Sequence, residues 1–123
     1  MLGGKRTSRV GDQIMKVVAD LLLRKVRDPR VKDVTLTGIE VSKDLRHSRI
    51  FFSVMGEIKD IQKTQKGLDS ARGFIKREIG SRLDIKYIPD IIFKYDPTLE
   101  KTEDLEKLFK KINLDKSNSP GNE

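Results

Sequence analysis

The strongest constraint on the fold is a long helical pattern at residues 59–83 that lies between two strand patterns. Its inward-facing apolar residues are Ile61, Leu68, Ala71, Ile75 and Ile79. In residues 48–55 before it, apolar side chains alternate with others, and residues 85–95 after it are rich in Ile, Phe and Tyr. Two strands that are joined by a helix in one sheet pair in parallel. The sequence therefore predicts that these two strands are parallel.

A second helix is predicted near the N-terminus, at Arg9–Arg27. Its apolar stripe consists of Val10, Ile14, Val17, Val18 and Leu21. Thr7 or Ser8 is expected to cap it, because either hydroxyl can accept a hydrogen bond from a free amide of the first turn. Pro29 is expected to end it, because a residue before proline, here Asp28, is disfavoured in the helical region.

A further strand is predicted at Val34–Lys43. The residues expected on one of its faces are Thr35, Thr37, Ile39 and Val41. The short polar segment 43–47 predicts a hairpin to the strand at 48–55. Pro89 cannot donate a ladder hydrogen bond, so the last strand is expected at a sheet edge or with a bulge near its start. The predicted class is α+β, in the order α-β-β-α-β, with the helices on one face of a three-stranded sheet.

The chain is predicted to form one folded domain with short terminal segments. Residues 1–5 are expected to be a flexible N-terminus, and residues 6–96 hold all of the strand and long-helix patterns. Residues 97–112 are expected to form a short, charged helical extension. Residues 113–123 turn to Asn, Ser, Pro and Gly, which predicts a disordered tail.

The charge of the chain indicates a polyanionic partner. Of the net charge of +7, residues 1–96 carry +8, from 21 Lys and Arg against 13 Asp and Glu. Such an excess on the folded part favours nucleic acid, although an idle basic surface has the same composition. No apolar run is longer than three residues, as at Leu21 to Leu23, and no secretory signal pattern is present. The expectation is a soluble, cytoplasmic protein that does not enter a membrane.

The sequence predicts no catalytic residue, no metal site and no cofactor. The chain has no cysteine and a single histidine, His47, in the predicted hairpin. A lone histidine of this kind is far more often passive than catalytic, and the acids are spaced to pair with Lys or Arg. Gly4-Lys5-Arg6 resembles the end of a P-loop, but Arg6 stands where Ser or Thr must bind magnesium. A non-enzymatic protein is therefore predicted.

Gly73 is unexpected in the middle of a helix, where glycine costs roughly 1 kcal/mol relative to alanine. A helical wheel places it opposite the apolar stripe, on the face that holds Lys66, Ser70, Arg77 and Gly80. Two interpretations remain open from the residues alone. Either Gly73 bends the helix around its sheet, or it bares the backbone so that a phosphate can approach between Arg72, Lys76 and Arg77.

Three segments resemble the ribosome-binding factor A family. They are "SRVGDQIMKVVADLLLRKVRDPRV", "VTLTGIEVSKDLRHSRIFFSV" and "SARGFIKREIGSRLDIKYIPDIIFKYD". The resemblance covers about residues 6–96 in the family's order, and it implies a KH-like fold of type II topology. In that fold, Ala71-Arg72-Gly73 forms a helix kink where a typical KH domain has a Gly-x-x-Gly loop.

The resemblance also implies a function. Members of this family are non-enzymatic assembly factors that bind the immature small (30S) ribosomal subunit and its 16S-type rRNA. They assist processing of the 5′ end, support growth in the cold and leave before translation. A monomer that prefers free 30S to 70S ribosomes, with an assembly GTPase as a further partner, is the expectation. The predicted RNA-binding residues are Arg6, Arg9, Lys66, Ala71, Arg72, Gly73, Lys76, Arg77 and Arg82.

Ala71 departs from the glycine that opens a KH loop, and the spacing to Gly73 is one residue shorter. Such a loop clamps four single-stranded nucleotides, so phosphate contacts and shape recognition are expected instead. Three alternatives have weaker support. "RIFFSVMG" faintly resembles an RRM strand, the helix after Gly73 could enter a DNA groove, and an interaction scaffold would leave the charge without a role.

Overall fold

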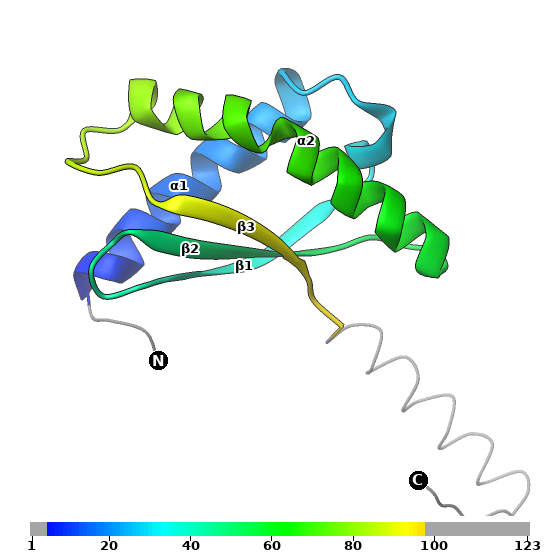
Figure 1. Cartoon of the computed structure of the whole chain (residues 1–123), viewed down its shortest axis with the longest axis horizontal. Helices are drawn as coiled ribbons and strands as arrows, with labels where there is room; N and C mark the ends of the chain where they lie inside the picture. Colours follow the sequence, from blue (N-terminus) through cyan, green and yellow to red (C-terminus); the bar gives the residue numbers. More distant parts are fainter. Residues whose placement is uncertain (1–4, 98–123) are drawn as a thin grey trace, which may run out of the picture.

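The computed structural model describes residues 5–97, and the predicted order of elements is confirmed (Figure 1). The elements are α1 (Lys5–Arg24), the 3-10 turn η1 (Pro29–Val31), β1 (Thr35–Val41), β2 (His47–Ser53), α2 (Ile58–Arg82) and β3 (Asp90–Tyr95). Residues 1–4 of the predicted flexible N-terminus lie outside the described residues. So do the helical extension predicted at 97–112, from residue 98 onward, and the tail predicted at 113–123.

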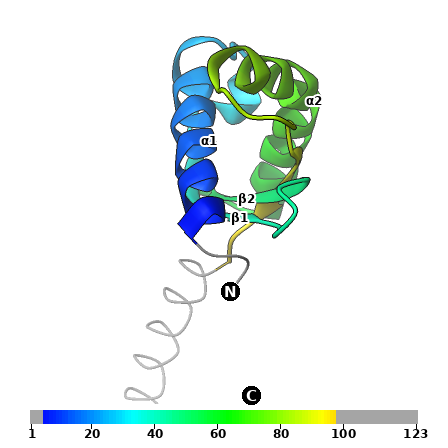
Figure 2. The ribbon, with the colours of Figure 1, turned by 90° about the vertical axis from the view of Figure 1, so that its left-hand side faces the viewer.

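The sheet has the predicted topology. Its strand order is β1-β2-β3, with β1 antiparallel and β3 parallel to β2. Ile50 at the centre of β2 lies opposite Ile39 of β1 and Phe93 of β3. Both helices lie against the same face of this sheet, side by side (Figures 1 and 2). The KH-like α+β arrangement is therefore confirmed.

β3 is an edge strand, as Pro89 predicted, but it is shorter than expected. It begins at Asp90 rather than Ile85, and the residues before it form an irregular loop. Pro89 has no amide hydrogen to donate, so the Asp90 amide makes the first bond, to the Arg46 carbonyl oxygen at 2.8 Å. Proline therefore sets the start of the strand.

The faces predicted for β1 are wrong at its beginning, because the strand has a bulge. Leu36 pairs with Phe52 and Gly38 with Phe51, which leaves Thr37 as the extra residue. The bulge lets Leu36 and Ile39 both pack on the core, while Thr37 is exposed. The Thr37 hydroxyl donates to Asp96 Oδ2 at 2.7 Å, across the sheet at the end of β3.

α1 begins and ends earlier than predicted. It starts at Lys5, so Thr7 and Ser8 lie inside the helix and do not cap it. Thr7 is buried, and the helix approaches β1 closely at Gly11, where an added Cβ would lie 3.2 Å from Ile39 Cγ2. This packing on β1 explains why the helix extends toward the N-terminus. Its predicted apolar stripe is buried.

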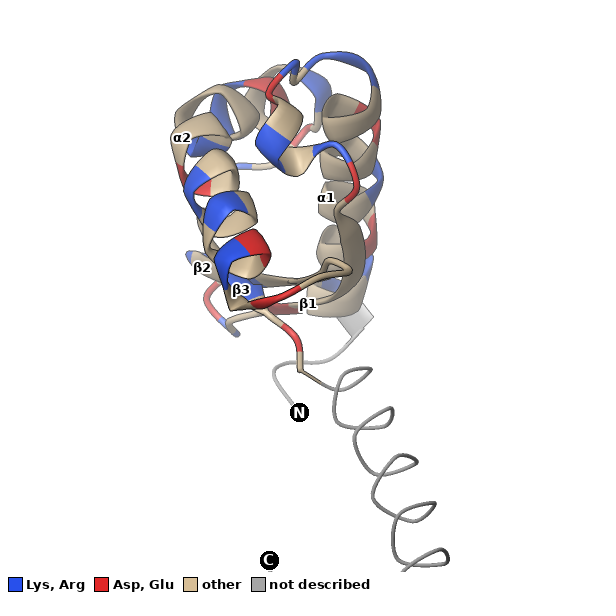
Figure 3. Cartoon of the chain, turned by 90° about the vertical axis from the view of Figure 1, so that its right-hand side faces the viewer, with Lys and Arg blue, Asp and Glu red and all other residues tan. Residues whose placement is uncertain are grey.

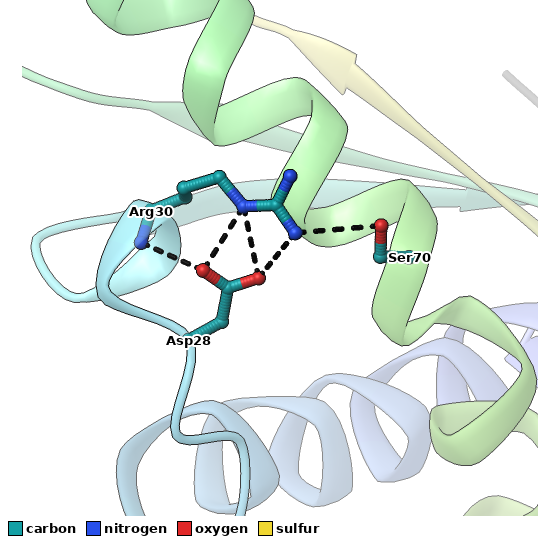
Figure 4. A network of polar contacts seen from close by, with 3 residues as sticks. All are labelled: Asp28, Arg30 and Ser70. Atoms are coloured by element: carbon teal, nitrogen blue, oxygen red, sulfur yellow. Dashed lines mark hydrogen bonds and ion pairs between the residues drawn. The ribbon is translucent and has the colours of Figure 1, made fainter.

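Asp28 and Arg30 explain why α1 does not continue to Pro29. Asp28 is extended, with φ −93° and ψ 119°, and its carboxylate accepts the Arg30 amide of η1 at 2.9 Å. The Arg30 guanidinium donates to the same carboxylate, with Nη2 2.6 Å from Oδ2, and reaches Ser70 Oγ of α2 at 3.5 Å (Figure 4). The turn is therefore braced against α2.

Gly67 brings α2 against this turn. A Cβ added at Gly67 would lie 2.8 Å from Val31 Cγ1 and 3.0 Å from Arg30 Cβ. Val31 is buried in the core cluster, which both helices, η1, β2 and β3 share. That cluster consists of Val10, Ile14, Val17, Val18, Leu21, Val31, Ile50, Phe52, Leu68, Ile75, Ile79, Ile91 and Phe93.

The hairpin between β1 and β2 is confirmed, and polar bonds close it. The Ser42 hydroxyl donates to Asp44 Oδ1 at 2.6 Å, the Arg46 amide donates to the same oxygen at 3.0 Å, and the His47 amide donates to Ser42 Oγ at 3.1 Å. Leu45 has a φ of 62°, a left-handed conformation that a branched side chain adopts rarely. Ser42 and Asp44 therefore hold a strained turn.

Acid is expected to loosen the turn at Asp28. The hydrogen bond from Arg30 lowers the pKa of Asp28 from its ordinary 3.8. A carboxyl group with a lowered folded-state pKa contributes stability that is complete above its unfolded pKa and is lost as pH falls through the folded value. In Asp28→Asn, stability at pH 7 is expected to be below that of the wild type, and the gap is expected to close at a pH well below 3.8. Urea denaturation from pH 7 to acid measures this, and a gap that is independent of pH contradicts it.

Candidate nucleic-acid interface

Gly73 lies on the exposed face of α2, as the helical wheel predicted. A Cβ added there would meet only Arg77 Nη1, at 3.8 Å, which is ordinary van der Waals contact. Its φ is not positive, so the backbone does not require glycine. Gly80 was predicted on the same open face, and this is wrong, since an added Cβ would collide with the Ile88 side chain of the α2–β3 loop.

α2 is one continuous helix through Ala71-Arg72-Gly73, although its direction changes partway along (Figures 1 and 2). Amides in the interior of an α-helix are bonded to carbonyl oxygens four residues earlier, and only the first four are free. The amide of Gly73 is therefore not free to bind a phosphate. Any phosphate contact here must come from the side chains of Arg72, Lys76 and Arg77.

A groove runs beside Gly73, between α2 and the starts of β2 and β3. Its volume is about 460 Å³. It is lined by His47, Arg72, Gly73, Lys76, Asp90, Ile91 and Ile92. The predicted cations Arg72 and Lys76 therefore share one hollow with Gly73, and residues from two strands complete it.

The cations of the groove differ in how they are engaged. Lys76 Nζ lies 2.5 Å from Asp90 Oδ1, and this bond lowers the pKa of Asp90. Among the ion pairs of residues 5–97, none involves Arg72 or Arg77, and both residues are exposed. Because Arg77 lies over the open face of Gly73, the two arginines are the cations that an incoming anion meets first.

The other predicted RNA-binding residues lie apart from this groove. Arg6 and Arg9 line a separate hollow at the N-terminal end of α1, and Lys66 is exposed two turns before Gly73. Ala71 is half-buried and packs against the core. Arg82 is 2.8 Å from Asp20 of α1 and 3.4 Å from Glu78, so its position is explained by the contact between the two helices.

Sequence reasoning missed the groove residues that come from the strands. His47 and Asp90 pair across β2 and β3, and Ile92 follows with 53% of its surface exposed. The parallel register, which the sequence did not specify, brings them beside α2. An available signal was the position of Ile92, an apolar residue that strand alternation places on the face opposite Ile91 and Phe93.

Positive charge recurs along α2, as Figure 3 shows. Neither described helix, α1 nor α2, has a stretch that is long and apolar enough to cross a membrane. Within residues 5–97, no group of three His, Asp or Glu side chains is placed to hold a metal ion. The described surface thus offers a basic groove with an open glycine beside it.

Comparisons with known proteins agree on one family. The family model for ribosome-binding factor A matches residues 6–109. A ribosome-binding factor A of Syntrophus aciditrophicus is 45% identical over 114 residues, which cover 93% of each chain.

A crystal structure and a fitted homology model share the fold. The crystal structure of ribosome-binding factor A from Thermus thermophilus is similar with a TM-score of 0.65 and 17% identity, over 72% of this chain and 93% of that one. A homology model of the Thermus thermophilus factor, fitted into a cryo-EM map of its 30S complex, gives a TM-score of 0.59 with the same identity and coverage. The family-model match and the 45% identity place the chain: it belongs to the ribosome-binding factor A family.

Proposed function

We propose that this protein binds the immature small (30S) ribosomal subunit through its 16S-type rRNA and assists maturation of that subunit. The observation that carries the proposal is the groove of Arg72, Gly73 and Lys76 in a chain of this family. Its exposed arginines suit phosphate oxygens, and the open face of Gly73 leaves room for a sugar–phosphate backbone. The Thermus thermophilus relative, whose fold is similar, was fitted into a map of a 30S complex.

The protein acts without catalysing a reaction itself. It binds as a monomer through residues 6–96. It prefers free 30S subunits to 70S ribosomes and assists processing of the 5′ end of the RNA in the cytoplasm. An assembly GTPase is a further partner in its release. Its contribution is largest in the cold, where misfolded RNA rearranges slowly.

RNA processing in a deletion strain tests this proposal. A strain of the source organism that lacks the protein is expected to accumulate 5′-extended small-subunit RNA in the cold. The wild-type chain restores mature ends. Primer extension measures the ratio of extended to mature ends. A deletion strain with normal ends in the cold would contradict the role in maturation.

A further inference from the structure

Tyr87 is an exposed aromatic residue that the fold does not explain. It lies in the loop between α2 and β3, where Ile85 and Ile88 pack against the core while Tyr87 keeps 52% of its surface exposed. Arg46 Cζ lies 5.2 Å and Lys86 Nζ 5.4 Å from the centre of its ring. An aromatic ring that is flanked by two cations resembles the surfaces that bind single-stranded nucleic acid.

The surroundings of this ring are basic. Tyr87 lines the hollow of about 570 Å³ that holds Arg6 and Arg9, together with Lys43 and Lys86. Two acids, Asp44 and Asp84, also line it. Asp44 accepts hydrogen bonds from the Ser42 hydroxyl and the Arg46 amide, and the four cations of the hollow outnumber its two acids.

The cations here are available to a ligand. The ion pairs between described residues involve none of Arg6, Arg9, Lys43, Arg46 and Lys86. Cations that are not held by carboxylates keep their hydrogen-bond donors for phosphate. The hollow is therefore a second basic site at this end of the domain.

Arg46 connects this hollow to the groove beside Gly73. It precedes His47, which lines the groove, and its carbonyl oxygen accepts the amide of Asp90, which lines the groove as well. The Arg46 guanidinium lies over the ring of Tyr87, which lines the hollow. A nucleic-acid strand in the groove thus needs to pass only the end of the hairpin to reach the ring.

We propose that Tyr87, Arg46 and Lys86 form a second contact for RNA, at which one unpaired base takes the place of a cation over the Tyr87 ring and the neighbouring phosphates meet Arg46 and Lys86. The inference rests on the proposed RNA-binding function. The base must be single-stranded, because bases inside a duplex are stacked on each other and their faces are covered. The strand that occupies the groove continues over the hairpin to this site.

Tyrosine fluorescence provides a direct test, because the chain has no Trp and only two Tyr. A short oligouridylate is added to the full-length wild type and to Tyr87→Phe. We expect quenching in the wild type that is largely absent in Tyr87→Phe, which keeps the ring and the affinity. Equal quenching in both proteins overturns the proposal.

Affinity provides a second readout, with a strand of abasic residues of the same length as the control. Stacking contributes about 1–3 kcal/mol per base, and 1.4 kcal/mol is tenfold, so Tyr87→Ala is expected to bind oligouridylate roughly tenfold more weakly. Its affinity for the abasic strand stays unchanged. Two variants that each remove one positive charge test the role of Lys86. Lys86→Ala is expected to bind both strands more weakly, whereas Lys59→Ala, at the opposite end of α2, is expected to bind both as tightly as wild type.

The failures of the two proposals are distinguishable. If Tyr87→Ala binds oligouridylate as tightly as wild type, the stacking site is overturned while RNA binding stands. The same follows if its affinities for oligouridylate and for the abasic strand fall by the same factor. If polyglutamate competes as strongly as oligouridylate at equal charge, the hollow is a site for acidic protein and the inference fails. If the wild type binds neither oligouridylate nor small-subunit RNA, the proposed function itself fails.

Discussion

Replacement of Arg72, Lys76 and Arg77 by alanine is expected to weaken binding to small-subunit RNA by roughly a hundredfold at 0.1 M salt. Each phosphate contact contributes about 0.7–0.9 to the slope of log affinity against log salt concentration. Three contacts therefore raise the affinity by about two decades when salt falls from 1 M to 0.1 M, and the variant loses this gain. The slope itself is expected to decrease by about two to three. The reason is that the amides of α2 are occupied, so these side chains carry the contacts.

A matched variant separates local contact from net charge. Lys16, Lys25 and Lys32 are exposed, and none of them lines the groove. Their triple replacement by alanine removes the same charge but is expected to retain most of the affinity. Both triple variants are expected to have melting temperatures close to that of the wild type, because the replaced side chains lie on the surface. Equal losses of affinity in the two variants would show that only the overall field matters.

Two of the three glycines of α2, Gly67 and Gly73, are expected to respond to alanine in opposite directions. Gly67→Ala forces a methyl group into the space of Val31 and Arg30, and such overpacking costs about 1–3 kcal/mol. The gain in helix propensity of up to roughly 1 kcal/mol offsets only part of it. Gly73→Ala meets open space, so it keeps that whole gain in the free energy of unfolding.

Urea denaturation of the two variants measures this difference. Binding of Gly73→Ala to the small subunit then shows whether Gly73 serves RNA binding or only the bend of α2. Gly73→Ala is expected to be more stable than wild type yet to bind the small subunit more weakly, because the methyl group stands where the RNA backbone approaches. If Gly73→Ala binds and rescues cold growth fully, the glycine serves only the bend of α2. If Gly67→Ala is as stable as wild type, the packing of η1 on α2 is misjudged.

The order of elements could be predicted because it depends on local periodicity and chain connectivity. The crossover from β2 through α2 to β3 allows only parallel pairing, and the structure has it. The bulge at Thr37 could not be predicted, since it depends on how β1 pairs with β2. The start of β3 was missed because the apolar side chains Ile85 and Ile88 reach the core from a loop.

The candidate site, too, has features that could be predicted from the sequence and features that could not. The exposure of Gly73 follows from the helical wheel alone, so the prediction holds. Gly67, Gly80 and Arg82 depend on partners from η1, the α2–β3 loop and α1, which lie far away in sequence. A wheel has no information about such contacts. The cation pair around Tyr87 was missed for the same reason, because Arg46 comes from the hairpin.

Sedimentation through sucrose gradients tests the central claim most directly, that the groove beside Gly73 binds the small ribosomal subunit. The full-length chain is mixed with purified 30S subunits and, separately, with 70S ribosomes. The wild type is expected to co-sediment with 30S subunits and not with 70S ribosomes. The variant without Arg72, Lys76 and Arg77 is expected to remain at the top of the gradient, whereas the variant without Lys16, Lys25 and Lys32 still sediments with 30S. A wild type that stays at the top, or a groove variant that sediments with 30S as fully as wild type, would contradict the account.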